Sequence, residues 1–379
     1  MNSRVFVIGG SHHNILGVIR SLGERGIQPF VVIQCPQKKP YVSRSQYILR
    51  SWIVESDEEV LAILRQEGTR HPDEKAVLIV CADNLSSLVD LHADELSQWY
   101  DLPGTKKQGR ITHLMDKEVM SALAREVGFL VPSSRAIHTE DDSNVDIPLP
   151  WIIKPLVSKD GSKDDIIRIY SSEDWHQYRQ HHHLHVQIQQ LIDKDYEYQL
   201  IGLSLNEGEE VIIPGYSYVL RPSANTNTGF LHYMTLDATH QQVLDLGKKF
   251  LKTIGYSGLF SLEFLRGKDG KDYFMEINFR NDGNAICVTA AGVNLPYIWY
   301  LYQTGGDYRE EIERSQLKPV YVMPEFSDIS LIIHGKLNIL TWVKDIFRTD
   351  RFMEYDKRDK APFWYEITRK VRKVILNQS

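Results

Sequence analysis

Two glutamates in the stretch 259–281 (LFSLEFLRGKDGKDYFMEINFRN) have the spacing that would let them face one another across a β-hairpin. Strand-like runs flank the pair Asp269-Gly270, which is favoured at the centre of a two-residue hairpin loop. With that loop, Glu263 lies directly opposite Glu276. Two carboxylates in this arrangement repel one another, so we expect the pair to need a partner of opposite charge.

The same hairpin places an amide and a guanidinium beside the two carboxylates. Because strand side chains alternate between faces, we expect Asn278 and Arg280 on the glutamate face, and Phe264, Tyr273 and Met275 on the other. Two carboxylates and an amide oxygen are hard ligands that suit Mg²⁺, with phosphate oxygens completing its octahedron. Arg280 could then stabilise the charge on a transferring phosphoryl group. The alternative is a solvated hairpin face with a structural Glu–Arg pair.

The N-terminal part of the chain has the pattern of an open α/β sheet. Continuous apolar runs at 4–10, 28–34 and 76–81 are typical of buried parallel strands, and amphipathic segments lie between them. The glycine pair that ends the first run could accept a phosphate or carboxylate at a helix N-terminus, but no third glycine completes a dinucleotide-binding pattern. We therefore expect a Rossmann-like domain over residues 1–112 and do not expect a dinucleotide site in it.

Beyond residue 112 the pattern changes to one helix followed by several strands. Residues 116–129 predict a helix with Asp116 in its first turn and Gly128 at its end. The sequence WIIKP at 151–155 predicts a short strand. A polar loop at 158–165 and strand signals at 166–170 and 186–213 follow. This order predicts an α+β domain after the N-terminal one.

The hairpin and the segments before it resemble the ATP-grasp superfamily, with the recognisable pieces in the family's order across residues 115–290. The resemblance implies that Glu263, Glu276 and Asn278 hold the Mg²⁺ ions that bridge the ATP phosphates. Two ions are expected, and Mn²⁺ could replace Mg²⁺. The resemblance also implies that Arg280 lies near the transferred phosphoryl group.

The resemblance extends to residues that would contact the nucleotide. Lys117 matches the first nucleotide-contacting lysine and Lys154 the second, which reaches the α- and β-phosphates. The loop 158–165 stands where the family has its mobile phosphate-covering loop, and 189–200 stands where it has its adenine hinge. The contacts implied there are Gly161 and Ser162 in the loop, Gln190, Leu191 and Ile192 at the adenine, and Glu197 at the ribose hydroxyls. The sequence departs from the family in having one loop glycine, and in Gln190 where an acidic residue is common.

The order of domains looks most like that of carbamoyl-phosphate-synthase-like carboxylate–amine ligases, including D-aspartate ligases. It implies a pre-ATP-grasp domain at 1–112, an ATP-grasp domain at 113–330 with a mobile lid at about 150–188, and a helical C-terminal extension at 331–379. The family makes an acyl phosphate from a carboxylate and ATP, and an amine then converts it into an amide. The leading hypothesis is an ATP- and Mg²⁺-dependent ligase of this kind. The alternative is a nucleotide-binding regulatory protein with a degenerate ATP-grasp site.

On the substrate side, Arg221 stands in the Tyr-, Asn- and Thr-rich stretch 215–230. Its guanidinium could hold a substrate carboxylate in a bidentate pair, which would give it a catalytic role beside Arg280 and Lys154. A surface salt bridge is an equal alternative. Such a stretch suits a small polar acid, either an amino acid or a sugar acid, while the amine stays unidentified. Dimers are common in the family, so a homodimer is a further expectation.

Composition argues against several other classes of protein. The 379 residues are 42% hydrophobic and carry a net charge of −6, which argues against a protein built to coat nucleic acid. Three widely separated cysteines allow no disulfide framework. No apolar run approaches the roughly 20 residues of a membrane span. We therefore expect a cytoplasmic protein.

The C-terminal tail 351–379 has the opposite charge to the whole chain, with eight basic residues against four acidic ones. Four apolar residues fall at helical spacing away from the basic ones: Trp364, Ile367, Val371 and Val374. A helix of this kind could dock on the body with the apolar stripe inward, which is the arrangement we prefer. It could instead make weak peripheral contact with an anionic membrane.

Overall fold

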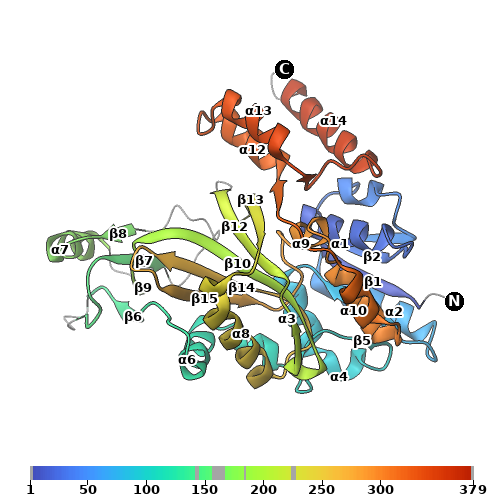
Figure 1. Cartoon of the computed structure of the whole chain (residues 1–379), viewed down its shortest axis with the longest axis horizontal. Helices are drawn as coiled ribbons and strands as arrows, with labels where there is room; N and C mark the ends of the chain where they lie inside the picture. The colour runs from blue at the N-terminus through green and yellow to red at the C-terminus, as the bar shows by residue number, and fades with distance from the viewer. Residues whose placement is uncertain (1–2, 141–144, 156–166, 183–184, 223–227, 377–379) are drawn as a thin grey trace.

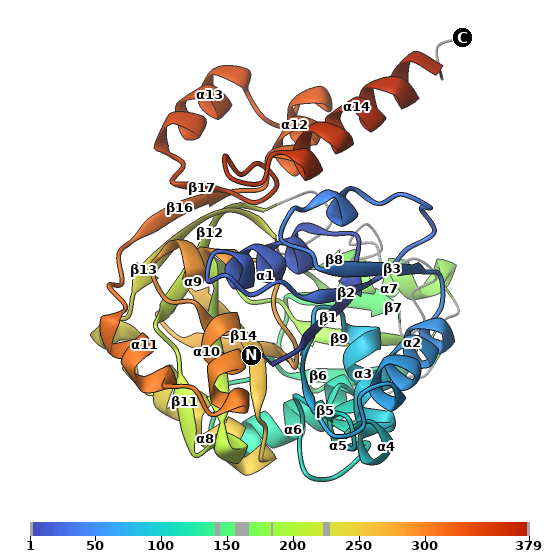
Figure 2. The ribbon, with the colours of Figure 1, turned by 90° about the vertical axis from the view of Figure 1, so that its right-hand side faces the viewer.

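The computed structural model describes residues 3–140, 145–155, 167–182, 185–222 and 228–376. These residues form three β-sheets of five, eight and four strands, with helices packed around them (Figure 1). The N-terminal sheet and the four-stranded sheet lie towards opposite ends of the molecule, and the eight-stranded sheet lies between them. The C-terminal helices project from one side of this body in both views (Figures 1 and 2).

The five-stranded N-terminal sheet is parallel throughout. Its strands are β1 (Val5–Gly10), β2 (Phe30–Gln34), β3 (Arg50–Val54), β4 (Ala76–Val80) and β5 (Tyr100–Asp101), in the order β3-β2-β1-β4-β5. The helices of this part are α1 (His13–Gly23), the 3₁₀ turn η1 (Tyr41–Arg44), α2 (Asp57–Thr69), α3 (Asp83–Leu91), α4 (Ala93–Leu96) and α5 (Arg110–Leu114). The strands predicted at the three apolar runs are confirmed as β1, β2 and β4. The sequence did not predict β3, because it begins with two polar residues and is only part-buried at the sheet edge.

The eight-stranded sheet carries the two glutamates. Its strands are β10 (Lys194–Leu205), β11 (Glu210–Ile212), β12 (Gly215–Pro222), β13 (Gly229–Thr235), β14 (Gly258–Gly267), β15 (Asp272–Asn278), β16 (Val320–Met323) and β17 (Arg351–Phe352). The order is β15-β14-β10-β12-β13-β16-β17, with β11 paired to β10. The helices around it are α6 (Lys117–Val127), α8 (Gln241–Ile254), α9 (Ile286–Ala290), α10 (Leu295–Thr304) and α11 (Tyr308–Arg314).

Both faces of the eight-stranded sheet are buried, as alternate residues of β10 show. Tyr198 and Leu200 pack in one core with α6 and α8. Ile201 and Leu203 pack in a second core with α9, α10 and the N-terminal sheet. This shared second core fixes the N-terminal sheet against the sheet that carries the two glutamates.

The four-stranded sheet is antiparallel and has a small core of its own. It consists of β6 (Ser134–His138), β7 (Trp151–Pro155), β8 (Ile167–Ile169) and β9 (His185–Gln190) in the order β6-β9-β7-β8, with helix α7 (Ser172–His181) beside it. The sheet begins at Ser134, before the boundary of about 150 that the sequence predicted for a lid. The strand predicted at 151–155 is confirmed as β7 with the same bounds.

The loop of the glutamate hairpin differs from the predicted one. It has three residues, 268–270, and the backbone N–H of Gly267 donates to the carbonyl of Lys271 at 2.9 Å. Gly270 has a φ of +77°, which glycine adopts without the strain that a side chain would cause. A three-residue loop that ends in a left-handed glycine is a common hairpin connection. The predicted two-residue loop was therefore wrong.

A β-bulge next to Glu263 restores the predicted pairing of the glutamates. On the loop side of the bulge Phe264 pairs with Phe274, and on the other side Glu263 pairs with Glu276. Phe274 is buried in the core, whereas Tyr273 is only part-buried, as is Met275. The faces predicted for those two part-buried side chains were therefore wrong, because the bulge reverses the alternation between itself and the loop.

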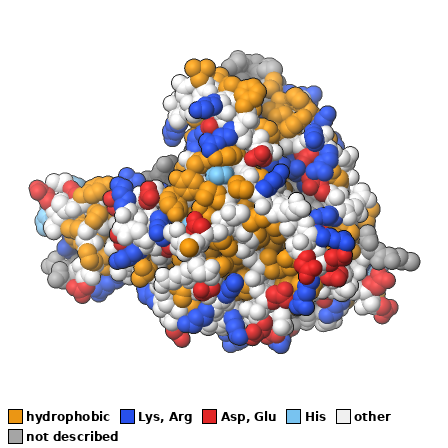
Figure 3. Space-filling view, viewed as in Figure 1, with side chains coloured by type: hydrophobic (Ala, Val, Ile, Leu, Met, Phe, Trp, Pro, Cys, Tyr) orange, Lys and Arg blue, Asp and Glu red, His pale blue; other side chains and the backbone are white. Residues whose placement is uncertain are grey.

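The C-terminal helices are α12 (Glu325–Ile333), α13 (Ile339–Arg348) and α14 (Ala361–Leu376). Helix α14 packs against η1, with the Arg44 guanidinium 4.7 Å from the ring centre of Tyr365. The predicted inward stripe was wrong at Trp364 and Val371, which are 54% and 52% exposed. The side chain of Val374 lies outside the described residues. Figure 3 shows hydrophobic and basic side chains side by side over the C-terminal helices.

None of the helices in the described residues is both long enough and apolar enough to cross a membrane.

Candidate active site

A cavity of about 1290 Å³ lies between the four-stranded and the eight-stranded sheet. Residues of α6, β7, β8, β9, β10, β14 and β15 line it. Seven of the predicted site residues are among them: Lys117, Gln190, Leu191, Ile192, Glu197, Glu263 and Glu276. The structure thus brings most of the expected nucleotide residues and both glutamates into one cavity.

Glu263 and Glu276 are cross-strand neighbours at the wall of this cavity. The Oε1 atom of Glu263 accepts hydrogen bonds from Gln199 Nε2 at 3.0 Å and Asn278 Nδ2 at 3.1 Å. Among the described residues, the Glu276 carboxylate has no hydrogen-bond or ion-pair partner. The two amides orient the Glu263 carboxylate, and the two glutamates lie together at the cavity wall.

Arg280 follows β15 and is held by acidic and amide groups. Its guanidinium donates to both oxygens of Asp83 (2.9 and 3.2 Å), to Asp282 (3.1 Å) and to Asn278 Oδ1 (3.0 Å). Burial opposes the positive charge, but the negative charges of Asp282 and Asp83 outweigh it, so the pKa of Arg280 is raised. A permanently charged guanidinium is therefore fixed next to the amide that contacts Glu263.

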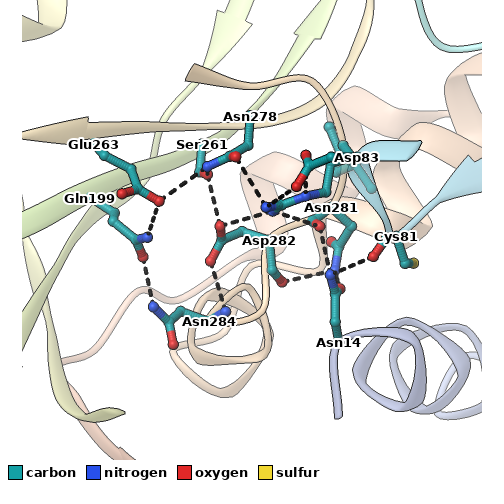
Figure 4. A network of polar contacts seen from close by, with 12 residues as sticks. Asn14, Cys81, Asp83, Gln199, Ser261, Glu263, Asn278, Asn281, Asp282 and Asn284 are labelled. Atoms are coloured by element: carbon teal, nitrogen blue, oxygen red, sulfur yellow. Dashed lines mark hydrogen bonds and ion pairs between the residues drawn. The ribbon is translucent and has the colours of Figure 1, made fainter. Parts of the chain in front are cut away.

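The turn after Arg280 joins the site to the N-terminal sheet. The backbone N–H of Asn281 donates to the carbonyl of Val80 at 2.9 Å. The side chain of Asn14 also bonds to Asn281: its Nδ2 donates to the backbone carbonyl of Asn281 at 2.8 Å, and its Oδ1 accepts from Asn281 Nδ2 at 2.6 Å (Figure 4). These contacts lie at the carboxyl end of β4.

A second set of hydrogen bonds connects the turn after Arg280 to Glu263. Asp282 accepts from Ser261 Oγ at 2.9 Å, and Asn284 Nδ2 donates to Gln199 Oε1 at 2.8 Å (Figure 4). Gln199 in turn donates to Glu263. Sequence reasoning missed Gln199 and Ser261. The available signal was that each is a polar residue with a hydrophobic residue on either side of it in the sequence.

Backbone hydrogen bonds hold the segments that carry the predicted nucleotide-contacting residues. Lys117 is exposed at the start of α6, where Asp116 caps the helix by accepting from the N–H groups of residues 118 and 119 at 2.9 and 3.0 Å. The N–H groups of Gln190 and Leu191 donate to backbone carbonyls of residues 133 and 150, both at 2.8 Å. The carboxylate of Glu197 forms an ion pair with Lys194. The backbone at residues 190 and 191 is therefore held by two neighbouring segments.

Apolar side chains that the sequence did not single out form two walls of the cavity. Ile152 comes from the four-stranded sheet, and Leu265 and Met275 come from the eight-stranded sheet. Met275 was missed because the predicted alternation placed it on the other face of the hairpin. The cavity thus combines an apolar section with a section lined by a lysine and carboxylates.

Several predicted site residues lie elsewhere or outside the described part. Arg221 does not line the cavity, because its guanidinium donates to Asp328 on α12 at 3.1 Å and to Asp345 on α13 at 2.7 Å. Gly161, Ser162 and the side chain of Lys154 lie outside the described residues. Arg221 thus has the salt-bridge partners that one interpretation predicts. Its contact with a substrate carboxylate stays a prediction.

The variant Arg221→Gln is expected to lower the free energy of unfolding by about 2–3 kcal/mol, somewhat less than breaking a fully buried ion pair. The cause is that Asp328, which is buried, loses its charge partner. We expect no change in the KM for the carboxylate that the resemblance implies as a substrate. Arg309→Gln is the control, since Arg309 pairs with Glu210 at the exposed surface. A raised KM with an unchanged melting temperature would show that Arg221 contacts the substrate.

The residues at the glutamate pair fit a divalent cation. Glu263 and Glu276 supply carboxylate oxygens, and the Asn278 amide oxygen has a lone pair beyond the one that Arg280 occupies. The described residues contain no group of three or more His, Cys, Asp or Glu side chains that could hold a metal by themselves. Further oxygens would have to come from a phosphate ligand or water, as is usual for Mg²⁺.

No protein-family model matches the sequence, and no curated protein matches it either. Solved structures do match. An L-amino acid ligase from Bacillus licheniformis is 14% identical with a TM-score of 0.63, over 85% of this chain and 79% of that one. A phosphoribosylglycinamide synthetase from Anaerococcus prevotii is 13% identical with a TM-score of 0.62, over 85% and 80%. The ADP complex of purK, an N5-carboxyaminoimidazole ribonucleotide synthetase, is 14% identical with a TM-score of 0.60, over 84% and 81%.

At these identities the likeness shows the fold and does not extend to the reaction. The neighbours are ATP-grasp carboxylate–amine ligases, and this chain has the fold that they share.

Proposed function

We propose that the chain is an ATP- and Mg²⁺-dependent ligase that joins a carboxylate to an amine through an acyl phosphate. The observation that carries the proposal is the directly opposed pair Glu263 and Glu276 at the wall of a cavity large enough for a nucleotide. Facing carboxylates weaken a strand pair unless a cation lies between them. Neighbours solved with ADP and with the magnesium salt of ADP support these cofactors.

The two sections of the cavity suit the two ends of ATP. Ile152 on one side and Leu265 and Met275 on the other would sandwich the adenine ring. Lys117 would neutralise phosphate charge, and Glu197 would exchange its lysine partner for the ribose hydroxyls. For Lys154, Gly161 and Ser162, the family pattern alone supports a phosphate contact.

In the proposed reaction, a carboxylate oxygen attacks the γ-phosphorus of ATP, which gives an acyl phosphate and ADP. The amine nitrogen then attacks the acyl carbon, phosphate leaves, and the nitrogen loses a proton to give the amide. Mg²⁺ held by Glu263, Glu276 and Asn278 would neutralise the charge of the phosphates. Arg280, fixed beside Asn278, would stabilise the charge that develops on the transferred phosphoryl group.

The proposed carboxylate is an amino acid or a sugar acid. The L-amino acid ligase among the neighbours supports the amino acid. A homodimer is proposed from the family pattern, and the biotin carboxylase domain of the Hydrogenobacter thermophilus 2-oxoglutarate carboxylase is described as a dimer.

A phosphate-release screen of amino acids and sugar acids, each crossed with a set of amines, tests the reaction. ADP and phosphate are expected in equal amounts, and only with a matched pair of carboxylate and amine. The regulatory alternative predicts calorimetric binding of Mg-ATP with no ADP release in any combination. Absence of Mg-ATP binding would contradict both.

A further inference from the structure

Helix α13 turns an apolar face to solvent. Ile339, Val343 and Phe347 follow one another at intervals of four residues and are 57%, 40% and 87% exposed. Leu340 lies beside them and is 76% exposed, and Ile333 at the end of α12 is 75% exposed. Single exposed apolar residues are ordinary, but a contiguous group of large ones marks an interaction surface. We call these five side chains the α13 surface.

Basic side chains border the α13 surface. Lys344 and Arg348 lie four and eight residues after Leu340, so they line one edge of the apolar face, and both are exposed. On the other side of the helix, Asp345 forms an ion pair with Arg221 of β12 at 2.7 Å. This ion pair holds the polar side of α13 against the body and leaves the apolar side outward.

The rest of the C-terminal segment also exposes mainly positive charge. Residues 331–372 contain ten basic and six acidic residues. The acidic side chains turn inward at Glu354, Asp356, Asp359 and Glu366, all of which are buried. Most of the basic ones are exposed, as at Lys336, Lys344, Lys357, Lys360 and Arg372. The net charge of −6 for the whole chain therefore conceals a C-terminal segment whose exposed charge is mainly positive.

We propose that the α13 surface docks on a lipid bilayer that contains anionic lipids. A helix with a broad apolar face and flanking basic residues is suited to lie in a membrane interface, where apolar burial and attraction to anionic headgroups add together. Helices α12–α14 project from one side of the body, so α13 can approach a flat surface (Figures 1 and 2). A second copy of the chain fits less well, because pairing would bring the basic borders of two surfaces together. This inference is independent of the proposed reaction.

Co-flotation of the full chain with vesicles tests the proposal. The protein is expected to float with vesicles of phosphatidylcholine and phosphatidylglycerol, to stay behind with phosphatidylcholine alone, and to be released as salt rises. The double variant Leu340→Ser/Phe347→Ser is expected to bind the anionic vesicles about tenfold or more weakly, because two large apolar contacts are lost. Both sites are exposed, so its melting temperature should equal that of the native protein.

The matched control is Leu49→Ser/Leu91→Ser, which changes two leucines outside the C-terminal helices that are 56% and 50% exposed. It is expected to float like the native protein. The proposal is overturned if the native chain does not float, floats equally with neutral vesicles, or floats equally well when Leu340 and Phe347 are replaced. A dimer seen by light scattering that is lost only in the Leu340→Ser/Phe347→Ser variant would also overturn it, since the surface would then join two copies.

Discussion

With glutamine in place of Glu276, the protein is expected to lose Mg²⁺-dependent nucleotide binding and to turn over on the order of 10²–10³-fold more slowly. The substitution keeps the shape of the side chain and removes its charge. Because Glu276 faces Glu263 across the β14–β15 pair, the change also removes a repulsion between like charges. The free protein should therefore melt at the same temperature or slightly higher, while the stabilisation by Mg-ATP disappears.

Melting curves with and without ATP and Mg²⁺ separate the stability of the free protein from its stabilisation by Mg-ATP. A turnover assay measures the fall in rate. Glu209→Gln is the matched control, because it makes the same change at an exposed carboxylate paired with Lys252. It should retain both binding and turnover. If the Glu276→Gln protein showed the normal rise in melting temperature with Mg-ATP, the metal assignment would be wrong. Normal binding without turnover would place Glu276 in phosphoryl transfer instead.

The pairing of the two glutamates could be predicted from the sequence although the hairpin loop could not. A loop of three residues in place of two shifts the strands by one position, and the β-bulge between Glu263 and Phe264 shifts them back. A one-residue slip moves side chains to the opposite face, which is what happened to Tyr273 and Met275. The bulge is a feature of the two paired strands, and residue spacing does not report it.

Local motifs also predicted seven of the residues that line the cavity, because each motif is a short segment with its own pattern. The groups that hold the turn after β15 come from far away along the chain. Asp83 pairs with Arg280 across 197 positions, and Asn14 bonds to Asn281 across 267 positions. Such contacts depend on how the N-terminal sheet docks on the eight-stranded sheet, and no spacing rule links their members.

Helix α14 shows a different limit of sequence reasoning. Periodicity predicted the helix and its apolar stripe, but the inward direction that we preferred for the stripe was wrong at Trp364 and Val371. The surface that α14 meets offers the cationic side chain of Arg44, and the helix turns Tyr365 towards it while Glu366 is buried. Trp364 consequently remains exposed. The direction of a stripe follows from the partner surface, which the sequence of the helix does not contain.

The variant Arg20→Met is expected to lower the free energy of unfolding by about 3–5 kcal/mol, which is the cost of breaking a buried ion pair. Arg20 lies on α1 and is 1% exposed. Its Nε donates to Asp359 Oδ2 at 3.0 Å, and its two Nη atoms donate to the carbonyls of residues 353, 354 and 359 at 3.2, 2.9 and 3.0 Å. Methionine fills the space but leaves the Asp359 carboxylate buried without a countercharge.

Arg25→Met is the matched control, because Arg25 pairs with Glu311 at the surface and should contribute less than about 1 kcal/mol. Adding Asp359→Asn to Arg20→Met should recover part of the loss, since the amide removes the unpaired charge and can still accept from Ser45 Oγ. Urea unfolding of all variants measures the differences. Arg20 and Asp359 are 339 positions apart, so equal losses for Arg20→Met and Arg25→Met would mean that apolar packing, not this ion pair, holds the C-terminal segment on the N-terminal sheet.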